Sequence, residues 1–279
     1  MINLVKNYLL KNRRDNVLLK YTSITEYIED IYINLKDEER TILLKENINY
    51  KIGDIADNYK GYMSSQKEIN EKMRAILIDW LVATLFKFKL RTRILFLSVS
   101  IIDRYLTKEI INRVKLQLLG VTSLFIACKH EQTKTPPGIE FADSTDYTKE
   151  EILNMEYQIL KTLNFEIMTP TPIQFYEIIC VVLNFSSKEI LLGRYWMESF
   201  MIQYKSTFYS SSLIATSAAY LVFKYFSLRN YRIIFCEFFN SNNSYNKLKE
   251  CAKEIVNSEE ANRISNLLAV NNKFGQRDE

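Results

Sequence analysis

The sequence is poor in the residues that interrupt regular structure. Its 279 residues include only 6 glycines and 4 prolines. A β-sandwich or β-barrel of this length would need many more turn residues. A hydrophobic content of 47% and an aromatic content of 13% exclude a disordered chain. We therefore expect a mostly helical globular protein, with enough chain for one large domain or two of ordinary size.

Residues that commonly carry out chemistry are also scarce. The only histidine is His130, and the sequence lacks the motifs GxGxxG, GxxxxGK[ST], HExxH and GxSxG. Possible metal ligands do not cluster along the chain. We expect no metal, no cofactor and no enzymatic activity of its own, so the expected function is binding.

The sequence also lacks signs of membranes, nucleic acids and disulfides. The longest apolar run, residues 94–102, is too short to span a bilayer, and the N-terminus has no signal-peptide pattern. The formal net charge is +4, without a basic stripe, so no nucleic-acid partner is expected. The cysteines form no CxxC pair and suggest buried thiols in a reducing compartment; they are Cys128, Cys180, Cys236 and Cys251.

Helical patterns and breakers divide the chain. Ser23 and Glu26 form a capping box at the start of a helix, and residues 36–66 suggest a connector. The prolines of MTPTP (168–172) mark the best domain boundary. Residues 118–129 and 213–224 align without gaps, with small residues at matching places. Either any two buried helices look alike, or, as we favour, two helical domains share one plan.

Two pairs of charges fall on apolar helix faces and need partners. Lys129 ends a buried helix, where a cation suits the helix C-terminus. Glu156 lies on the apolar face of a later helix, so the two side chains could instead lie together and offer hydrogen bonds to a partner. Arg74 and Asp103 raise the same question, and for them an internal ion pair is the favoured interpretation.

Four stretches resemble the cyclin box in order and spacing: MRAILIDWL (73–81), 88–106, KLQLLGVTSLFIACKHE (115–131) and 147–166. Together with YMSSQKEINEK before them, they are most similar to mitotic B-type cyclins. The resemblance implies an all-α cyclin fold with two five-helix boxes in tandem and an N-terminal helix. The implied divisions are 1–20, a flexible N-terminus; 21–66, helix and connector; 67–168, first box; 169–265, second box; and 266–279, tail.

The resemblance implies a regulatory subunit, located in nucleus and cytoplasm, that binds and activates a cyclin-dependent serine/threonine kinase in G2/M control. Lys129 and Glu156 match residues that hold the kinase's C helix in its active position. Phe165, Tyr27 and Ile31 match further kinase contacts, whereas Asn34 replaces an aromatic residue. Arg74 and Asp103 match a structural ion pair.

The resemblance also implies a docking patch for substrates and inhibitors that carry Arg-x-Leu motifs. Its apolar stripe is expected at the surface, and a separate stripe of Arg74, Ile78, Leu81 and Leu85 is expected to be buried. Ala83 replaces an acidic residue, which puts a preference for the motif's arginine in doubt. The matching patch residues are Met73, Ile76, Leu77, Trp80, Leu116 and Gln117.

Residues 45–47 spell KEN and residues 40–43 fit RxxL, but both adjoin sequence expected to pack on the box, so neither is favoured as a degron. Two other functions stay open. A general transcription factor with the same fold would be expected to show a basic face and a zinc ribbon, and neither is visible. A cyclin-like adaptor would dock partners without activating a kinase.

Overall fold

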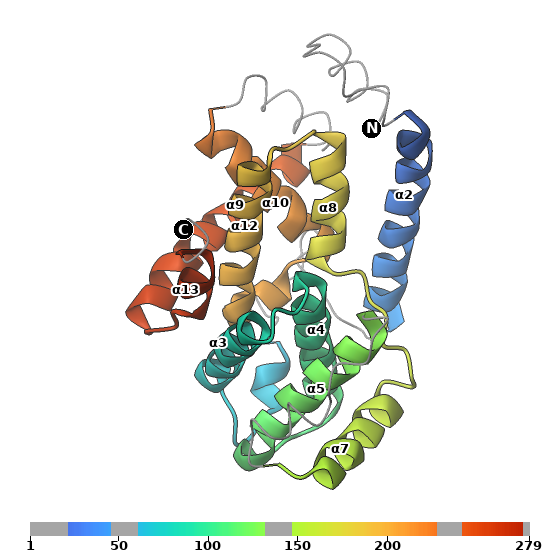
Figure 1. The fold of residues 1–279 in the computed structure, drawn as a ribbon, viewed down its shortest axis with the longest axis vertical. Helices are drawn as coiled ribbons and strands as arrows, with labels where there is room; N and C mark the ends of the chain where they lie inside the picture. The colour runs from blue at the N-terminus through green and yellow to red at the C-terminus, as the bar shows by residue number, and fades with distance from the viewer. Residues whose placement is uncertain (1–21, 46–60, 132–146, 228–241, 276–279) are drawn as a thin grey trace.

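The protein is described by a computed structural model that covers residues 22–45, 61–131, 147–227 and 242–275, in which every regular element is a helix (Figure 1). The predicted all-α fold is confirmed. None of the described helices combines the length and the apolar character that a bilayer span requires. The predicted flexible N-terminus, Cys236 and residues 46–47 of the KEN sequence lie outside the described residues.

The first box is built around one central helix, α5 (Leu116–Glu131), which packs against α3, α4 and α7 (Figure 1). Gly120 lets α3 approach closely, because a Cβ atom at this position would lie 2.6 Å from Cδ1 of Leu77. The other elements of this box are η2 (Tyr62–Ser65), α3 (Glu71–Lys87), α4 (Thr92–Lys108), η3 (Arg113–Lys115) and α7 (Lys149–Thr162).

The second box repeats this plan around α10 (Ser211–Tyr225), which packs against α8, α9 and α12. Ala215 and Ala218 are fully buried on α10. The two stretches of the sequence repeat are therefore the central helices of the two boxes. The other elements are α8 (Pro172–Val182), α9 (Ser187–Ile202), η4 (Tyr204–Phe208) and α12 (Asn242–Ile264).

The prediction of five helices in each box extends over residues 132–146 and 228–241, which lie outside the described residues. At the predicted boundary, Thr171 caps α8: its backbone N–H donates to Oε1 of Gln174 over 2.8 Å. Pro172 occupies the first turn of α8, where a backbone N–H has no helical partner to lose.

The N-terminal helix α2 (Thr22–Lys45) lies beside α8 of the second box (Figure 1). The connector predicted from residue 36 is wrong for residues 36–45, because α2 continues to Lys45. Polar residues in this part of α2 contact the second box: Glu39 is only 6% exposed and accepts hydrogen bonds from Ser212 of α10. The sequence pattern shows the polar residues but not the distant partner that buries one of them.

The predicted tail also forms a docked helix. Residues 269–275 make up α13 (Ala269–Gly275), which packs against α3 and α9. Lys273 is buried and donates to both carboxylate oxygens of Glu198 over 2.6 Å. The backbone N–H of Ala269 donates to Oδ1 of Asp79 over 3.0 Å, which ties the start of α13 to α3. Helix α13 therefore joins the second box to the first.

Candidate functional site

The structure brings Lys129 and Glu156 together as an ion pair at the C-terminal end of α5. Glu156 lies on the inward face of α7 and is 8% exposed, whereas the side chain of Lys129 is 39% exposed. The ammonium group also lies 4.4 Å from the centre of the Phe125 ring, within the range of a cation–π contact. Glu156 is therefore largely buried, whereas Lys129 reaches the surface. At this place each of the two side chains could hydrogen-bond to the backbone of a partner instead of to the other.

Exposed apolar side chains follow α7. Phe165 is 68% exposed and Met168 is 64% exposed. Phe165 has φ of 59°, a left-handed conformation that costs a non-glycine residue about 1–2 kcal/mol. Its backbone N–H donates to the carbonyl oxygen of Leu160 over 2.8 Å and closes the end of α7. Phe165 thus exposes a large apolar ring to solvent and also has a backbone conformation that is unfavourable for any residue other than glycine.

The outward face of α2 carries the other two predicted kinase contacts. Tyr27 is 66% exposed and Ile31 is 48% exposed. Further along the helix, Glu38 lines a shallow depression together with His130 of α5 and Met168 of the segment between the boxes. The C-terminal part of α2, the C-terminal end of α5 and the segment after α7 therefore meet on one side of the molecule.

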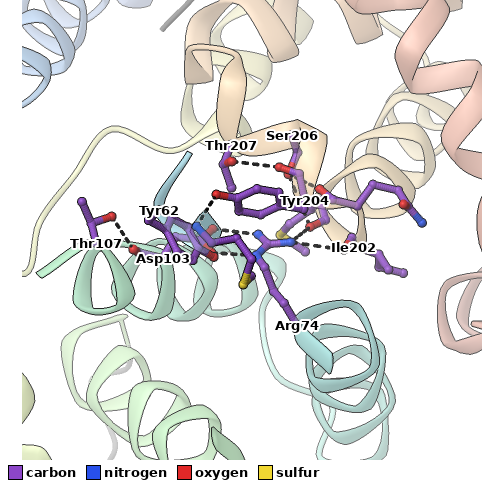
Figure 2. A network of polar contacts seen from close by, with 11 residues as sticks. Tyr62, Arg74, Asp103, Thr107, Ile202, Tyr204, Ser206 and Thr207 are labelled. Carbon is purple, nitrogen blue, oxygen red and sulfur yellow. Dashed lines mark hydrogen bonds and ion pairs between the residues drawn. The ribbon is translucent and has the colours of Figure 1, made fainter. Parts of the chain in front are cut away.

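Arg74 and Asp103 form a second ion pair, which is buried inside the molecule (Figure 2). Arg74 of α3 is 0% exposed and donates from Nε and Nη2 to the two carboxylate oxygens of Asp103, each over 2.7 Å. Its Nη1 donates to the carbonyl oxygens of Met201 and Ile202 at the end of α9, each over 3.2 Å. One side chain of the first box thus satisfies two carbonyls of the second.

Two tyrosines complete this network (Figure 2). The hydroxyl of Tyr62 donates to Oδ1 of Asp103 over 2.7 Å, and its ring meets the edge of Tyr204 at 5.0 Å. The hydroxyl of Tyr204 accepts the backbone N–H of Met63 over 2.9 Å. The sequence gives no sign of these partners, because Tyr204 lies 142 positions from Tyr62 and follows no recognisable spacing.

Burial and charge set the ionisation of the network. Burial disfavours the charged form of Arg74, but the neighbouring Asp103 carboxylate outweighs it and raises the pKa of the guanidinium above its ordinary value. Burial, and then the negative charge of Asp103, raise the pKa of Tyr62 well above its ordinary value of 10.0. Arg74 is therefore charged and Tyr62 neutral at neutral pH.

The predicted docking patch is only partly at the surface. Ile76 is 61% exposed, Gln117 is exposed, and Met73 and Trp80 are half-buried. The expectation of surface exposure is wrong for Leu77 and Leu116, which are each 6% exposed.

The packing of α3 on α5 explains why Leu77 is buried. Its side chain fills the space that Gly120 leaves free beside α5. Ala83, the position that departs from the family, is exposed.

Comparison with known proteins agrees with this architecture. Sequence models described as "Cyclin, N-terminal domain" and "Cyclin, C-terminal domain" match residues 54–168 and 170–279. The chain belongs to the cyclin family. The two matches meet at the segment that separates the two boxes.

Several B-type cyclins are similar to this cyclin. It is 34% identical over 252 residues to Cyclin-B2-1 of Oryza sativa subsp. japonica, covering 90% of this chain and 56% of that protein. It is 32% identical over 255 residues to the G2/mitotic-specific cyclin-B of Dictyostelium discoideum, covering 90% of this chain and 55% of that protein. The chain thus spans about half the length of the curated relatives it matches.

Among solved structures, a viral cyclin from herpesvirus saimiri has the same fold, with a TM-score of 0.65 at 20% identity. The match covers 79% of this chain and 97% of the viral one. Among the residues that the structure describes, histidine, cysteine, aspartate and glutamate side chains form no group of three that could hold a metal ion.

Proposed function

We propose that this cyclin is a regulatory subunit that binds and activates a cyclin-dependent protein kinase in G2/M control. The observation that carries the proposal is the half-exposed Lys129–Glu156 pair at the end of α5. In many protein interfaces aromatic and charged anchors supply most of the affinity, and this chain offers the exposed ring of Phe165 as well as Lys129. The names of the B-type relatives support the assignment to mitosis.

The proposed mechanism is conformational. Kinase activity requires an ion pair between the glutamate of the kinase's C helix and the lysine that positions ATP. Lys129 and Glu156 would hydrogen-bond to the backbone of that helix, and Phe165 would pack against it. Tyr27 and Ile31 of α2 would add a second area of contact. The cyclin would therefore act by binding the active position of the helix more tightly than the inactive one.

The test is a titration of the purified chain into a purified cyclin-dependent kinase, with phosphate transfer to a histone-type peptide as the readout. We expect saturable stimulation. Binding without stimulation would favour a non-activating adaptor. Tight, salt-sensitive binding to duplex DNA with no kinase binding would favour a cyclin-fold transcription factor.

We also propose that the patch on α3 docks peptides that contain Arg-x-Leu. The support is the exposed side chain of Ile76 between the half-buried Met73 and Trp80. Because Ala83 offers no carboxylate, the leucine of the motif should contribute more than its arginine. The arrangement predicts an apolar contact with a modest preference for a basic residue.

Ile76→Ala should weaken binding of a fluorescent Arg-x-Leu peptide and leave kinase stimulation unchanged. Ile110→Ala is the matched control, because Ile110 is also 61% exposed and lies outside the patch. Trp80→Ala should give the same result. Unchanged peptide binding in both patch variants would overturn the docking proposal without affecting the proposal of kinase activation.

A further inference from the structure

The inward face of α2 packs on the second box through apolar residues. Ile28 packs against Val182 of α8. The ring of Tyr32 meets the edge of Phe175 at a centroid distance of 5.8 Å. Leu35 is partly buried against the core. These contacts determine which face of α2 turns inward and leave Tyr27 and Ile31 outside.

An apolar stripe does not by itself determine the position of a helix along its own axis. Residues four apart share a helix face, and the sequence places Ile24, Ile28 and Tyr32 at this spacing. A shift by one turn, about 5.4 Å, toward the C-terminus of the helix would place Ile24, Ile28 and Ile31 where Ile28, Tyr32 and Leu35 now pack, so an apolar side chain would again fill each contact. Some other contact must therefore select the register of α2.

Glu39 supplies such a contact. Its Oε1 accepts the backbone N–H of Ser212 over 2.9 Å, and its Oε2 accepts the Ser212 hydroxyl over 2.7 Å. Nζ of Lys36 donates to the same carboxylate over 2.7 Å and to the Ser212 hydroxyl over 2.7 Å. The Ser212 N–H lies in the first turn of α10, where backbone N–H groups lack helical partners and the helix dipole favours a negative charge.

The surroundings of Glu39 make this contact decisive. A cleft of about 140 Å³ lies beside it, between Ile42 of α2 and Ile214 of α10. Apolar packing is therefore incomplete at this end of α2. Any shift of the helix would separate a buried carboxylate from its partners, which costs far more than exchanging two apolar side chains.

We propose that Glu39 is a positioning residue for kinase binding. Its contact with Ser212 fixes the register of α2, so that Tyr27 and Ile31 meet the kinase at the same time as Lys129. This inference rests on the proposed function. A merely structural Glu39 would affect the whole protein equally, whereas a positioning residue acts through Tyr27 and Ile31.

The first test is hydrogen exchange of the free protein. Glu39→Ala should speed exchange of the α2 amides at residues 27–35 and leave those of α5 unchanged. Asp37→Ala is the matched control, because it removes an exposed carboxylate from the same helix. Glu39→Gln keeps one acceptor for the Ser212 N–H and should give an intermediate rate. Unchanged α2 exchange in both Glu39 variants would overturn the inference.

The second test is a set of double-mutant cycles with kinase affinity as the readout. Glu39→Ala should weaken binding about tenfold in the wild-type background. In a Tyr27→Ala, Ile31→Ala background it should cause no further loss, because the contacts that it positions are already gone. In a Phe165→Ala background the full tenfold loss should return. Equal losses in all three backgrounds would show a general structural effect and contradict the inference.

The two tests keep this inference separate from the proposed function. If no cyclin-dependent kinase binds the wild-type chain, the proposed function fails and the kinase part of the inference fails with it. Hydrogen exchange then still decides whether Glu39 fixes α2. If the kinase binds and Glu39→Ala binds equally well, the proposed function stands and the positioning role is overturned.

Discussion

The two ion pairs of the first box, Arg74–Asp103 and Lys129–Glu156, join similar groups in opposite surroundings. Arg74 is fully enclosed, and every part of its guanidinium has a partner from α4 or from the second box. Lys129 reaches solvent with more than a third of its side chain. A buried pair can hold two domains together because nothing competes for its groups. A half-exposed pair can be offered to another molecule.

The difference is one of position on similar helices. Arg74 lies near the start of α3, where α9 and η4 of the second box close over it (Figure 2). Lys129 lies in the last turn of α5, where the helix runs out of the core. Substitutions in either pair, or in the residues beside it, should therefore affect stability and partner binding to different degrees.

The largest effect is expected for Arg74→Ala. It leaves Asp103 and the Met201 and Ile202 carbonyls without their buried donor, which should lower the free energy of unfolding by about 3–5 kcal/mol. Urea unfolding followed by circular dichroism measures this. Lys72→Ala, an exposed change on the same helix, should stay within about 0.5 kcal/mol of wild type. Equal free energies of unfolding for Arg74→Ala and Lys72→Ala would contradict the structural role of the buried Arg74–Asp103 pair.

Phe165→Gly should change stability and binding in opposite directions. Glycine adopts the left-handed backbone freely, so the free energy of unfolding should rise by about 1 kcal/mol. Loss of the exposed ring should weaken kinase binding about tenfold. Asn164→Gly, at a neighbouring residue with φ of 52°, should leave kinase affinity unchanged. A fall in both quantities for Phe165→Gly would mean that the ring supports the fold rather than a partner.

Tyr62→Phe should lower the free energy of unfolding by about 0.5–1.5 kcal/mol, because it removes one hydrogen bond to Asp103. The pKa of Tyr62 is raised above 10.0 in the folded protein, so its neutral form stabilises the fold below pH 10 and this contribution is lost as the pH rises further. The difference in the free energy of unfolding between Tyr62→Phe and the wild type should therefore become smaller above pH 10. Tyr157→Phe, at an exposed tyrosine, should show no such difference.

The smallest effect concerns the thiol of Cys128, which lies next to Lys129 in the chain. Burial raises its pKa to about 12, so it should resist alkylation at pH 8 while α5 stays packed. Peptide mapping after alkylation should find Cys128 protected in a Lys129→Ala, Glu156→Ala variant and modified more quickly in Arg74→Ala. Rapid modification in the former would show that the exposed pair also holds the core together.

The charges on apolar faces were the most informative signal in the sequence. A charge among apolar residues must find a partner or remain at the surface, so Arg74, Asp103, Lys129 and Glu156 could be singled out in advance. The cyclin fold was predicted from the resemblance of four stretches, in their order and spacing, to the cyclin box. Periodicity could not show the depth of Leu77, because that depends on the space beside Gly120 of another helix.

Contacts across long stretches of chain were beyond sequence reasoning. Glu39 meets Ser212 and Glu198 meets Lys273 at separations that no local pattern records. Both contacts bury a polar residue of a segment that the sequence assigns to a connector or a tail. Their existence depends on how the two boxes are placed, and this is determined by the whole fold.

The most direct test of this account measures kinase affinity and unfolding of the Lys129→Ala, Glu156→Ala variant on the same sample. Removing both partners leaves no buried charge unpaired. We predict a loss of kinase affinity of about a hundredfold, with the free energy of unfolding within about 1 kcal/mol of wild type. Unchanged kinase affinity, or a loss of stability as large as that of Arg74→Ala, would contradict the account.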